Sequence, residues 1–135
     1  MEEHEILIKR CNPEFGDILL NKVGITGIAK VVDTRKQFSI FVSVALLKLF
    51  NEFVNEKYIE LLINSQFVKK QSEEGTQGVG NKNLVIRTIK NFSIPIPPLE
   101  EQKRIVDKVD LIMDYLDKLQ QEIESQEIIL EEIVQ

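Results

Sequence analysis

Histidine and cysteine, which serve as catalytic residues and as metal ligands, occur once each in this chain, as His4 and Cys11. Neither has a second histidine or cysteine at a spacing that would hold zinc, and no histidine is placed to activate the thiol. The sequence also lacks a P-loop, a Gly-x-Ser-x-Gly motif and a His-Glu-x-x-His motif. We therefore expect no catalytic residue, no metal and no cofactor, and we look for residues that bind.

The residues best suited to binding DNA gather around a glycine-rich stretch at 72–83, SEEGTQGVGNKN. Amide side chains can read an adenine edge, and lysine can contact guanine or phosphate. A shorter turn, Gly24-Ile-Thr-Gly27, would let the backbone approach phosphate closely. The alternatives are a solvated connector, a plain hairpin turn and ordinary surface charge. The candidate DNA-binding residues are Thr26, Lys30, Lys69, Lys70, Thr76, Gln77, Asn81, Lys82 and Arg87, with Arg35 and Lys36 as weaker candidates.

The longest pattern is a heptad repeat over 99–134. Apolar residues recur at alternating spacings of four and three, which is typical of a left-handed coiled coil. Pro97 and Pro98 precede the repeat, and Glu100 and Glu101 place negative charge where the helix dipole favours it. The pattern predicts one uninterrupted helix that needs a partner to cover its seam. The predicted seam is Ile105, Val109, Ile112, Leu116, Leu119, Ile123, Leu130 and Ile133, with Gln126 as its one polar position.

Charge along this helix favours antiparallel pairing. Lys103, Arg104 and Lys108 lie near its start, and glutamates dominate its end. Antiparallel partners would set the basic end beside the acidic end, whereas parallel partners would stack acid on acid. The preference is modest, since an exposed ion pair contributes only about 0.2–1 kcal/mol. The alternative is a surface helix that caps its own domain, but four heptads exceed what a small domain needs.

The chain before this helix has the pattern of a small mixed domain. We predict strands at 18–22, 28–32 and 38–47, separated by glycine-containing or polar turns, and a short strand at 84–86. For residues 45–50, ALLKLF, the start of a helix is the alternative. Ile6 to Ile8 is a further short apolar run that could form a strand.

A helix is predicted between these strands. Asn55 is placed to cap it, and it should run to about Lys70 with an apolar face that includes Tyr58, Ile59, Ile63 and Phe67. Further on, isoleucines alternate with prolines at 94–97, which predicts an extended segment confined to a sheet edge.

The composition fits a globular protein in a reducing compartment. Of 135 residues 43% are apolar, and the single cysteine excludes an intrachain disulfide. The N-terminus carries no apolar export segment, so we expect a soluble, cytoplasmic protein. The net charge is −5; residues 99–135 hold 4 basic and 11 acidic side chains, which leaves a net of +2 on residues 1–98. A mildly basic domain therefore precedes an acidic helix, which is weak evidence for DNA binding.

The order of the motifs is itself informative. Gly16-Asp17-Ile18-Leu19 is followed by Gly24-x-x-Gly27, by Lys57-Tyr58 on a helix, by the glycine-rich loop, and by Ile-Pro-Ile-Pro-Pro-Leu-Glu-Glu-Gln at 94–102 leading into the heptads. This order resembles the specificity subunits of type I restriction-modification systems. The last motif is the most specific, and the resemblance covers the chain from about residue 14 onward.

The resemblance implies a non-catalytic subunit that directs a methyltransferase and restriction complex to DNA. A full subunit of that family has two target-recognition domains that read base pairs in the major groove, each followed by a long helix. The two helices pair antiparallel, set the spacing of the half-sites and dock the methyltransferase subunits. This chain has one domain and one helix, and few strands before Gly16. We therefore expect a half-subunit or a fragment, completed by a second copy in a two-fold dimer.

We therefore predict an α+β (mixed) fold, with a small, partial α/β target-recognition domain over 1–98 and a long antiparallel coiled-coil helix over 99–135. The predicted partners are double-stranded DNA, a DNA adenine methyltransferase subunit, the restriction subunit and a second copy of the chain; no membrane is involved. The alternative function is a truncated dimerisation module that has lost specific DNA binding. An enzyme ranks third, for want of a nucleophile and base.

Overall fold

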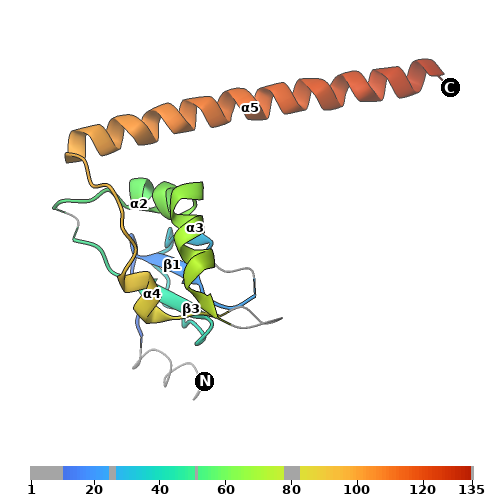
Figure 1. Ribbon diagram of the computed structural model, residues 1–135. Coiled ribbons are helices and arrows are strands. Elements are labelled where there is room, and N and C mark those ends of the chain that lie inside the picture. Colours follow the sequence, from blue (N-terminus) through green and yellow to red (C-terminus); the bar gives the residue numbers. More distant parts are fainter. Residues whose placement is uncertain (1–10, 25–26, 51, 78–82, 135) are drawn as a thin grey trace.

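The computed structural model describes residues 11–24, 27–50, 52–77 and 83–134. They form an α+β head from which one long helix projects, so the expected fold class is confirmed (Figure 1). The elements are β1 (Ile18–Asn21), β2 (Ala29–Val31), β3 (Val44–Leu47), α2 (Glu56–Ile63), α3 (Gln66–Gly75), β4 (Thr76–Gln77), β5 (Asn83–Leu84), α4 (Ile86–Lys90) and α5 (Leu99–Val134).

A three-stranded antiparallel sheet with the order β2-β1-β3 forms one side of the core. The strands predicted at 18–22 and 28–32 are confirmed as β1 and β2. Ile18 and Leu20 alternate on the inner face of the central strand and are fully buried. Gly16 precedes β1 with a φ of 88°, a conformation that favours glycine.

The strand predicted at 38–47 is wrong over its first part. Only Val44–Leu47 forms β3, because the four residues of β1 pair with that stretch alone. Phe41 and Val42 lie outside the sheet and are exposed. Residues 38–43 instead carry the chain back from β2 to the start of β3.

The single helix predicted from Asn55 to Lys70 is two helices. Its start is confirmed, since the Asn55 side chain accepts a hydrogen bond from the Tyr58 backbone N–H at 3.1 Å. α2 ends because Asn64 turns to the sheet: its Oδ1 accepts from the Ala29 N–H at 2.8 Å and its Nδ2 donates to the Ala29 carbonyl at 2.9 Å. Phe67, expected on the apolar face, is exposed on α3.

Two helical side chains thus cover the outer edge of β2. Besides Asn64, the Glu60 carboxylate accepts a hydrogen bond from the Val31 N–H. These residues lie one helical turn apart on α2, so they face the same strand. An edge that would otherwise offer free backbone donors is satisfied from within the head.

The loop predicted at 72–83 is wrong at both ends. α3 continues to Gly75, and the residues that follow it pair with Asn83–Leu84 as the hairpin β4–β5. The strand predicted at 84–86 stops at Leu84, since α4 begins at Ile86. Residues 78–82, like the short strand expected at 6–8, lie outside the described residues.

The position at a sheet edge predicted for 94–97 is wrong, because the proline-rich segment 92–98 pairs with no strand among the described residues. It crosses α2 instead, where the Tyr58 hydroxyl donates to the Pro95 carbonyl at 2.9 Å. Figure 1 shows this segment rising from α4 to the start of α5.

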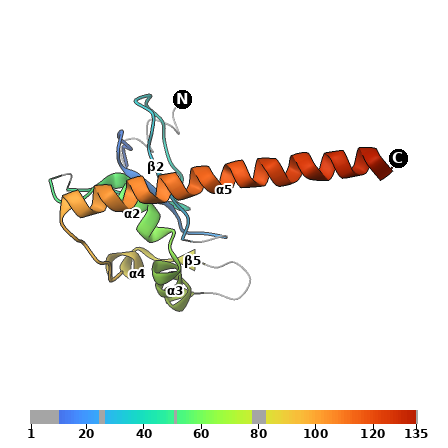
Figure 2. The same cartoon turned by 90° about the horizontal axis from the view of Figure 1, so that it is seen from above.

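The helix predicted over 99–134 is confirmed as α5. It passes over α2 and continues far beyond the head (Figure 2). At 1.5 Å per residue its 36 residues span about 54 Å. None of the helices in the described ranges combines the length and apolar character that crossing a membrane requires.

Candidate functional site

The first turns of α5 are fixed to the head through one buried amide. Gln102 is fully buried, and its Oε1 accepts from the Asn55 backbone N–H at 2.8 Å. Its Nε2 donates to the carbonyls of Phe53 and Pro97, both at 2.9 Å. Both amide hydrogens and the oxygen therefore have partners, as burial of a polar group requires. Val106, one turn later, is buried in the hydrophobic core of the head.

A second polar contact supports this junction. Tyr58, on the first turn of α2, is buried, and burial raises the pKa of its hydroxyl above the usual value. The neutral hydroxyl is the form that can donate to Pro95. Asn55, Tyr58 and Gln102 thus join α2, the proline segment and α5 at one point.

Beyond Val109 the helix leaves the head. Every described residue from 110 to 134 is exposed. The predicted seam residues Ile105 and Val109 are half-buried at the junction, whereas the others are uncovered. The exposed fractions are Ile112 47%, Leu116 52%, Leu119 54%, Ile123 50%, Leu130 60% and Ile133 73%.

The groove at the start of the seam is open. It is lined by apolar Ile105, Val109 and Leu111 and by charged side chains, Arg104 and Lys108 among them. This mixture of apolar and charged side chains matches what a coiled-coil partner contacts. A second helix could therefore follow the seam from the projecting part to the junction.

The candidate DNA-binding residues lie on several elements. Lys70 on α3 and Arg87 on α4 are exposed, and Lys69 is half-buried. Lys30 is exposed at the middle of β2. Thr76 and Gln77 form β4, beside the end of α3. Thr26, Asn81 and Lys82 lie outside the described residues.

Two of these candidates, Lys70 and Arg87, lie on helices that pack against each other, α3 and α4. The Thr88 hydroxyl donates to the Gly75 carbonyl at 3.3 Å, and a Cβ at Gly75 would come within 2.1 Å of the Thr88 side chain. Gln71 exchanges two hydrogen bonds with the Ser93 backbone, at 2.9 and 2.7 Å. The two helices that carry Lys70 and Arg87 therefore form one packed unit beside the β4–β5 hairpin.

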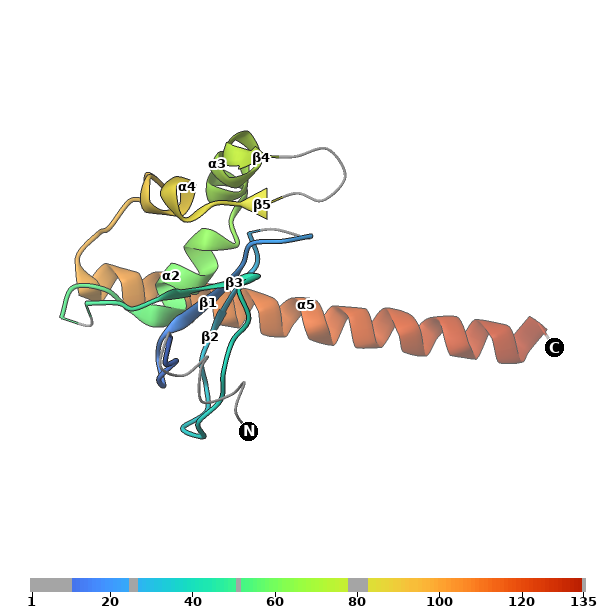
Figure 3. The same cartoon turned by 90° about the horizontal axis from the view of Figure 1, so that it is seen from below.

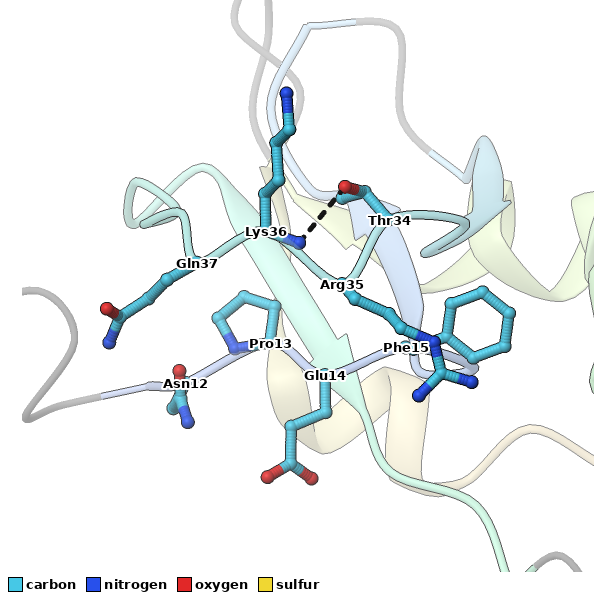
Figure 4. A pocket seen from close by; sticks show the side chains of 8 residues that line it. All are labelled: Asn12, Pro13, Glu14, Phe15, Thr34, Arg35, Lys36 and Gln37. Carbon is cyan, nitrogen blue, oxygen red and sulfur yellow. Dashed lines mark hydrogen bonds between the residues drawn. The ribbon is translucent and has the colours of Figure 1, made fainter.

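The weaker candidates occupy the other end of the head. Figure 3 shows the β2–β3 connection and the β4–β5 hairpin at opposite ends. In that connection the Arg35 guanidinium lies 4.7 Å from the centre of the Phe15 ring (Figure 4). The pocket around them, about 480 Å³, is lined by Asn12, Pro13, Glu14, Phe15, Thr34, Arg35, Lys36 and Gln37. The structure thus does not bring Arg35 and Lys36 together with the α3–α4 set.

The pocket around Arg35 is lined by no cysteine, histidine or serine. Within the described ranges, no group of three or more histidine, cysteine, aspartate or glutamate residues is placed to hold a metal. Cys11 is half-buried and carries a free thiol. Lys48 contacts Asp17 at 2.8 Å and Glu14 at 3.0 Å; its hydrogen bonds, first to Asp17 and then to Glu14, raise its pKa. This cluster ties the end of β3 to the turn before β1.

The family of this chain is shown by its similarity to known proteins. A family model described as the type I restriction modification DNA specificity domain matches residues 3–133. This chain belongs to that family. The specificity-domain match covers nearly the whole chain, in line with the motif order noted in the sequence.

Curated relatives of this specificity domain include three subunits of type I restriction enzymes. The EcoBI specificity subunit of Escherichia coli is 23% identical over 126 residues, which is 92% of this chain and 26% of that subunit. The EcoAI specificity subunit of Escherichia coli is 34% identical over 74 residues, 54% of this chain and 13% of the subunit. The MjaVIII specificity subunit of Methanocaldococcus jannaschii is 29% identical over 107 residues, which is 78% of this chain and 21% of that subunit. The chain spans about a quarter of the first of these.

A solved structure shows the same fold. The HsdS subunit from Thermoanaerobacter tengcongensis matches with a TM-score of 0.67 at 24% identity, over 80% of this chain and 28% of that one. The small antiparallel sheet, its helices and the long helix are thus the fold of a specificity-domain protein.

Sequence reasoning missed Gln102 as the residue that fixes α5 to the head. A signal existed: Gln102 lies three residues before Ile105 and four before Val106, so it continues the inward face of the helix as a polar residue. A polar side chain on an inward face is expected to have specific partners. Those partners, two backbone carbonyls and one N–H, could not be read from the sequence.

Proposed function

We propose that this chain is the DNA-recognition part of a type I restriction-modification complex, working in the cytoplasm without catalysing a reaction itself. Residues 1–98 would contact the DNA target, and the rod, residues 99–135, would pair antiparallel with a second helix and dock a DNA adenine methyltransferase subunit and, through it, the restriction subunit. Membership of the specificity family supports this reading.

The observation that carries the proposal is the uncovered seam. Twenty-five consecutive residues, 110–134, are exposed on a helix whose apolar side chains keep coiled-coil spacing. An isolated helix gains little stability without burial of such a face. A patch of this kind marks an interaction site. A second copy of the chain is the partner that its own pattern specifies.

The seam is symmetric about the midpoint between Leu116 and Leu119. Turning a second copy end for end about this point places each seam position opposite another seam position, with no position left over from Ile105 to Leu130. This register therefore buries the seam from Ile105 to Leu130. Its layers are Leu116 with Leu119, Ile112 with Ile123, Val109 with Gln126, and Ile105 with Leu130.

Charge supports the same register. The rod carries four basic residues, and each lies level with an acidic residue of the second copy. In a parallel, in-register pair each would lie level with itself, and like charges repel. The level pairs are Lys103 with Glu132, Arg104 with Glu131, Lys108 with Glu127, and Lys118 with Asp117.

The test of partner docking is affinity capture of the tagged full chain from its own cells. We expect an adenine methyltransferase subunit among the recovered proteins, identified by mass spectrometry. The chain carrying Leu116→Lys, with its seam interrupted, is the matched control and should recover less of it. Recovery of the chain alone would set aside the methyltransferase partner.

The test of DNA binding is the salt dependence of affinity for duplex DNA. If α3 and α4 face DNA, Lys70→Gln and Arg87→Gln should each weaken binding and reduce the slope of log K against log salt by about 0.9. Lys118→Gln on the rod removes the same charge and should leave the slope unchanged. Equal slopes for all three would favour the alternative of a dimerisation module that does not read DNA.

A further inference from the structure

An apolar surface lies at the end of the head from which α5 starts. Phe50, Phe53 and Ile96, which we call the apolar shelf, line one cleft of about 340 Å³. Their exposed fractions are 82%, 68% and 45%, high for large apolar side chains that share one cleft. Deeper in the cleft lie core residues such as Ile59 and Ile63. The shelf is thus an uncovered extension of the core.

The shelf adjoins the first turn of α5. Phe53 accepts a hydrogen bond from Gln102 through its carbonyl oxygen, and Ile96 lies next to Pro97, which accepts the other. The three views agree that the segment between β3 and α2 lies beside the beginning of the rod (Figures 1, 2 and 3). Any helix that follows the seam to its start therefore arrives at the shelf.

The antiparallel register defines what arrives there. It places Ile133 of the second copy level with Gln102, and Val134 level with Glu101. Gln102 is already fully buried and bonded within the head, so it cannot form a seam layer with Ile133. Ile133 and Val134, 73% and 85% exposed, would otherwise remain in water.

We propose that the tip of the second copy's rod, Ile133 and Val134, docks on the apolar shelf of the head. In a two-fold dimer this contact forms twice, once at each end of the coiled coil. Each head would then touch both rods, its own through Gln102 and the other through the shelf. The contact would fix the heads against bending at the junction. The inference rests on the proposed antiparallel dimer.

Charge beside the shelf favours this occupant. Lys103 and Arg104 are exposed on the second turn of α5. Glu131 and Glu132 precede the tip and lie level with them in the register. Arg104 already contacts Glu101 at 2.9 Å, an exposed pair that a second acidic neighbour can extend. A basic or purely polar helix end would find no such complement.

The test is a double-mutant cycle on the dimer dissociation constant, measured on the full chain by sedimentation equilibrium. Phe53→Ala should raise the constant at least tenfold, and Ile133→Ala should do the same. If the two side chains touch, the double variant should be weaker by much less than the product of the two factors. Phe67→Ala removes an equally large, 56% exposed ring from α3 and should leave the constant unchanged.

The cycle separates this inference from the dimer on which it rests. A dimer of wild-type affinity in Phe53→Ala, together with a monomer in Leu116→Lys, would overturn shelf docking and keep the coiled coil. Fully multiplicative effects of Phe53→Ala and Ile133→Ala would also overturn it. A wild-type chain that stays monomeric at about 100 μM would overturn both. Circular dichroism melting checks that each variant is folded. If Phe53→Ala does not fold, Phe50→Ala, at the most exposed position of the shelf, replaces it.

Discussion

The two parts of α5 have the same helical periodicity and opposite surroundings. Over 99–109 the helix packs on the head, with Gln102 and Val106 buried and a net charge of zero. Over 110–134 every described residue is exposed, and the net charge is −7. The packed part is fixed by polar bonds to named backbone atoms, whereas the projecting part offers an apolar stripe with nothing against it.

Local interactions do not explain why the projecting part should be helical. The side-chain hydrogen bond between Gln120 and Glu124, at 3.2 Å, is exposed, and a pair of this kind contributes about 0.2–0.5 kcal/mol. In proteins most helical stability comes from the packing of an amphipathic face, so we expect the projecting part to depend on a partner that packs against it. Heptad spacing therefore shows that a helix face must be buried, whereas the partner that buries it is set by what can reach that face.

The largest effect is expected from a charge placed in the middle of the projecting seam. Leu116→Lys buries two ammonium groups in a symmetric dimer, next to Leu119 of each partner. We expect the dimer dissociation constant to rise at least a hundredfold. Sedimentation equilibrium measures it, and the head should keep its melting temperature because Leu116 does not touch it.

The control for this experiment is Ser125→Lys, which adds the same charge to the same helix off the seam. It should leave dimerisation within a few-fold of wild type. A Leu116→Lys chain that remains dimeric at micromolar concentration would contradict the coiled-coil account.

The packed part is tested by removing its amide. Gln102→Ala leaves the Asn55 N–H and two carbonyls without their buried partner, and the expected loss is about 3 kcal/mol in the free energy of unfolding. Urea denaturation measures it. Gln120→Ala makes the same chemical change on the projecting part, where the side chain is exposed, and should shift stability by less than about 0.5 kcal/mol. Equal effects of the two substitutions would mean that the junction does not depend on Gln102.

The long helix was predictable to the residue because its signals are local. Prolines before Leu99, acids in the first turn and unbroken heptads all act within a few residues of one another. The N-cap at Asn55 and the first two strands are of the same kind. Each depends on spacing or turn chemistry that the sequence states directly.

The errors share another cause, which is tertiary contact. The helix from Asn55 stops at Ile63 because Asn64 bonds the edge of β2, which is 35 residues away in sequence. The strand at 38–47 is short because its partner β1 is short. The candidate DNA-binding residues carry no local signal of which face they occupy. The grouping of Lys69, Lys70 and Arg87 on α3 and α4, apart from Arg35, therefore came only from the structure.

The smallest expected effect concerns the Tyr58 hydroxyl, which belongs to the packed part. Tyr58→Phe removes one buried hydrogen bond to Pro95, so we expect a loss of about 1 kcal/mol near neutral pH. Burial raises the pKa of Tyr58 above 10.0 in the folded chain. The stability linked to this group is therefore complete below pH 10 and is lost as the pH rises through the folded-state pKa.

The free energies of unfolding of wild type and Tyr58→Phe should consequently converge as the pH rises above 10 and through the folded-state pKa of Tyr58, because only the wild type has a hydroxyl at position 58 that ionises more readily when unfolded. Tyr115→Phe is the matched control: its ring is 67% exposed on the projecting part, and its curve should stay parallel to that of wild type. Parallel curves for Tyr58→Phe as well would mean that water reaches the hydroxyl at the junction. The polar bonds of Gln102 would then have to account for the fixed direction of the rod by themselves.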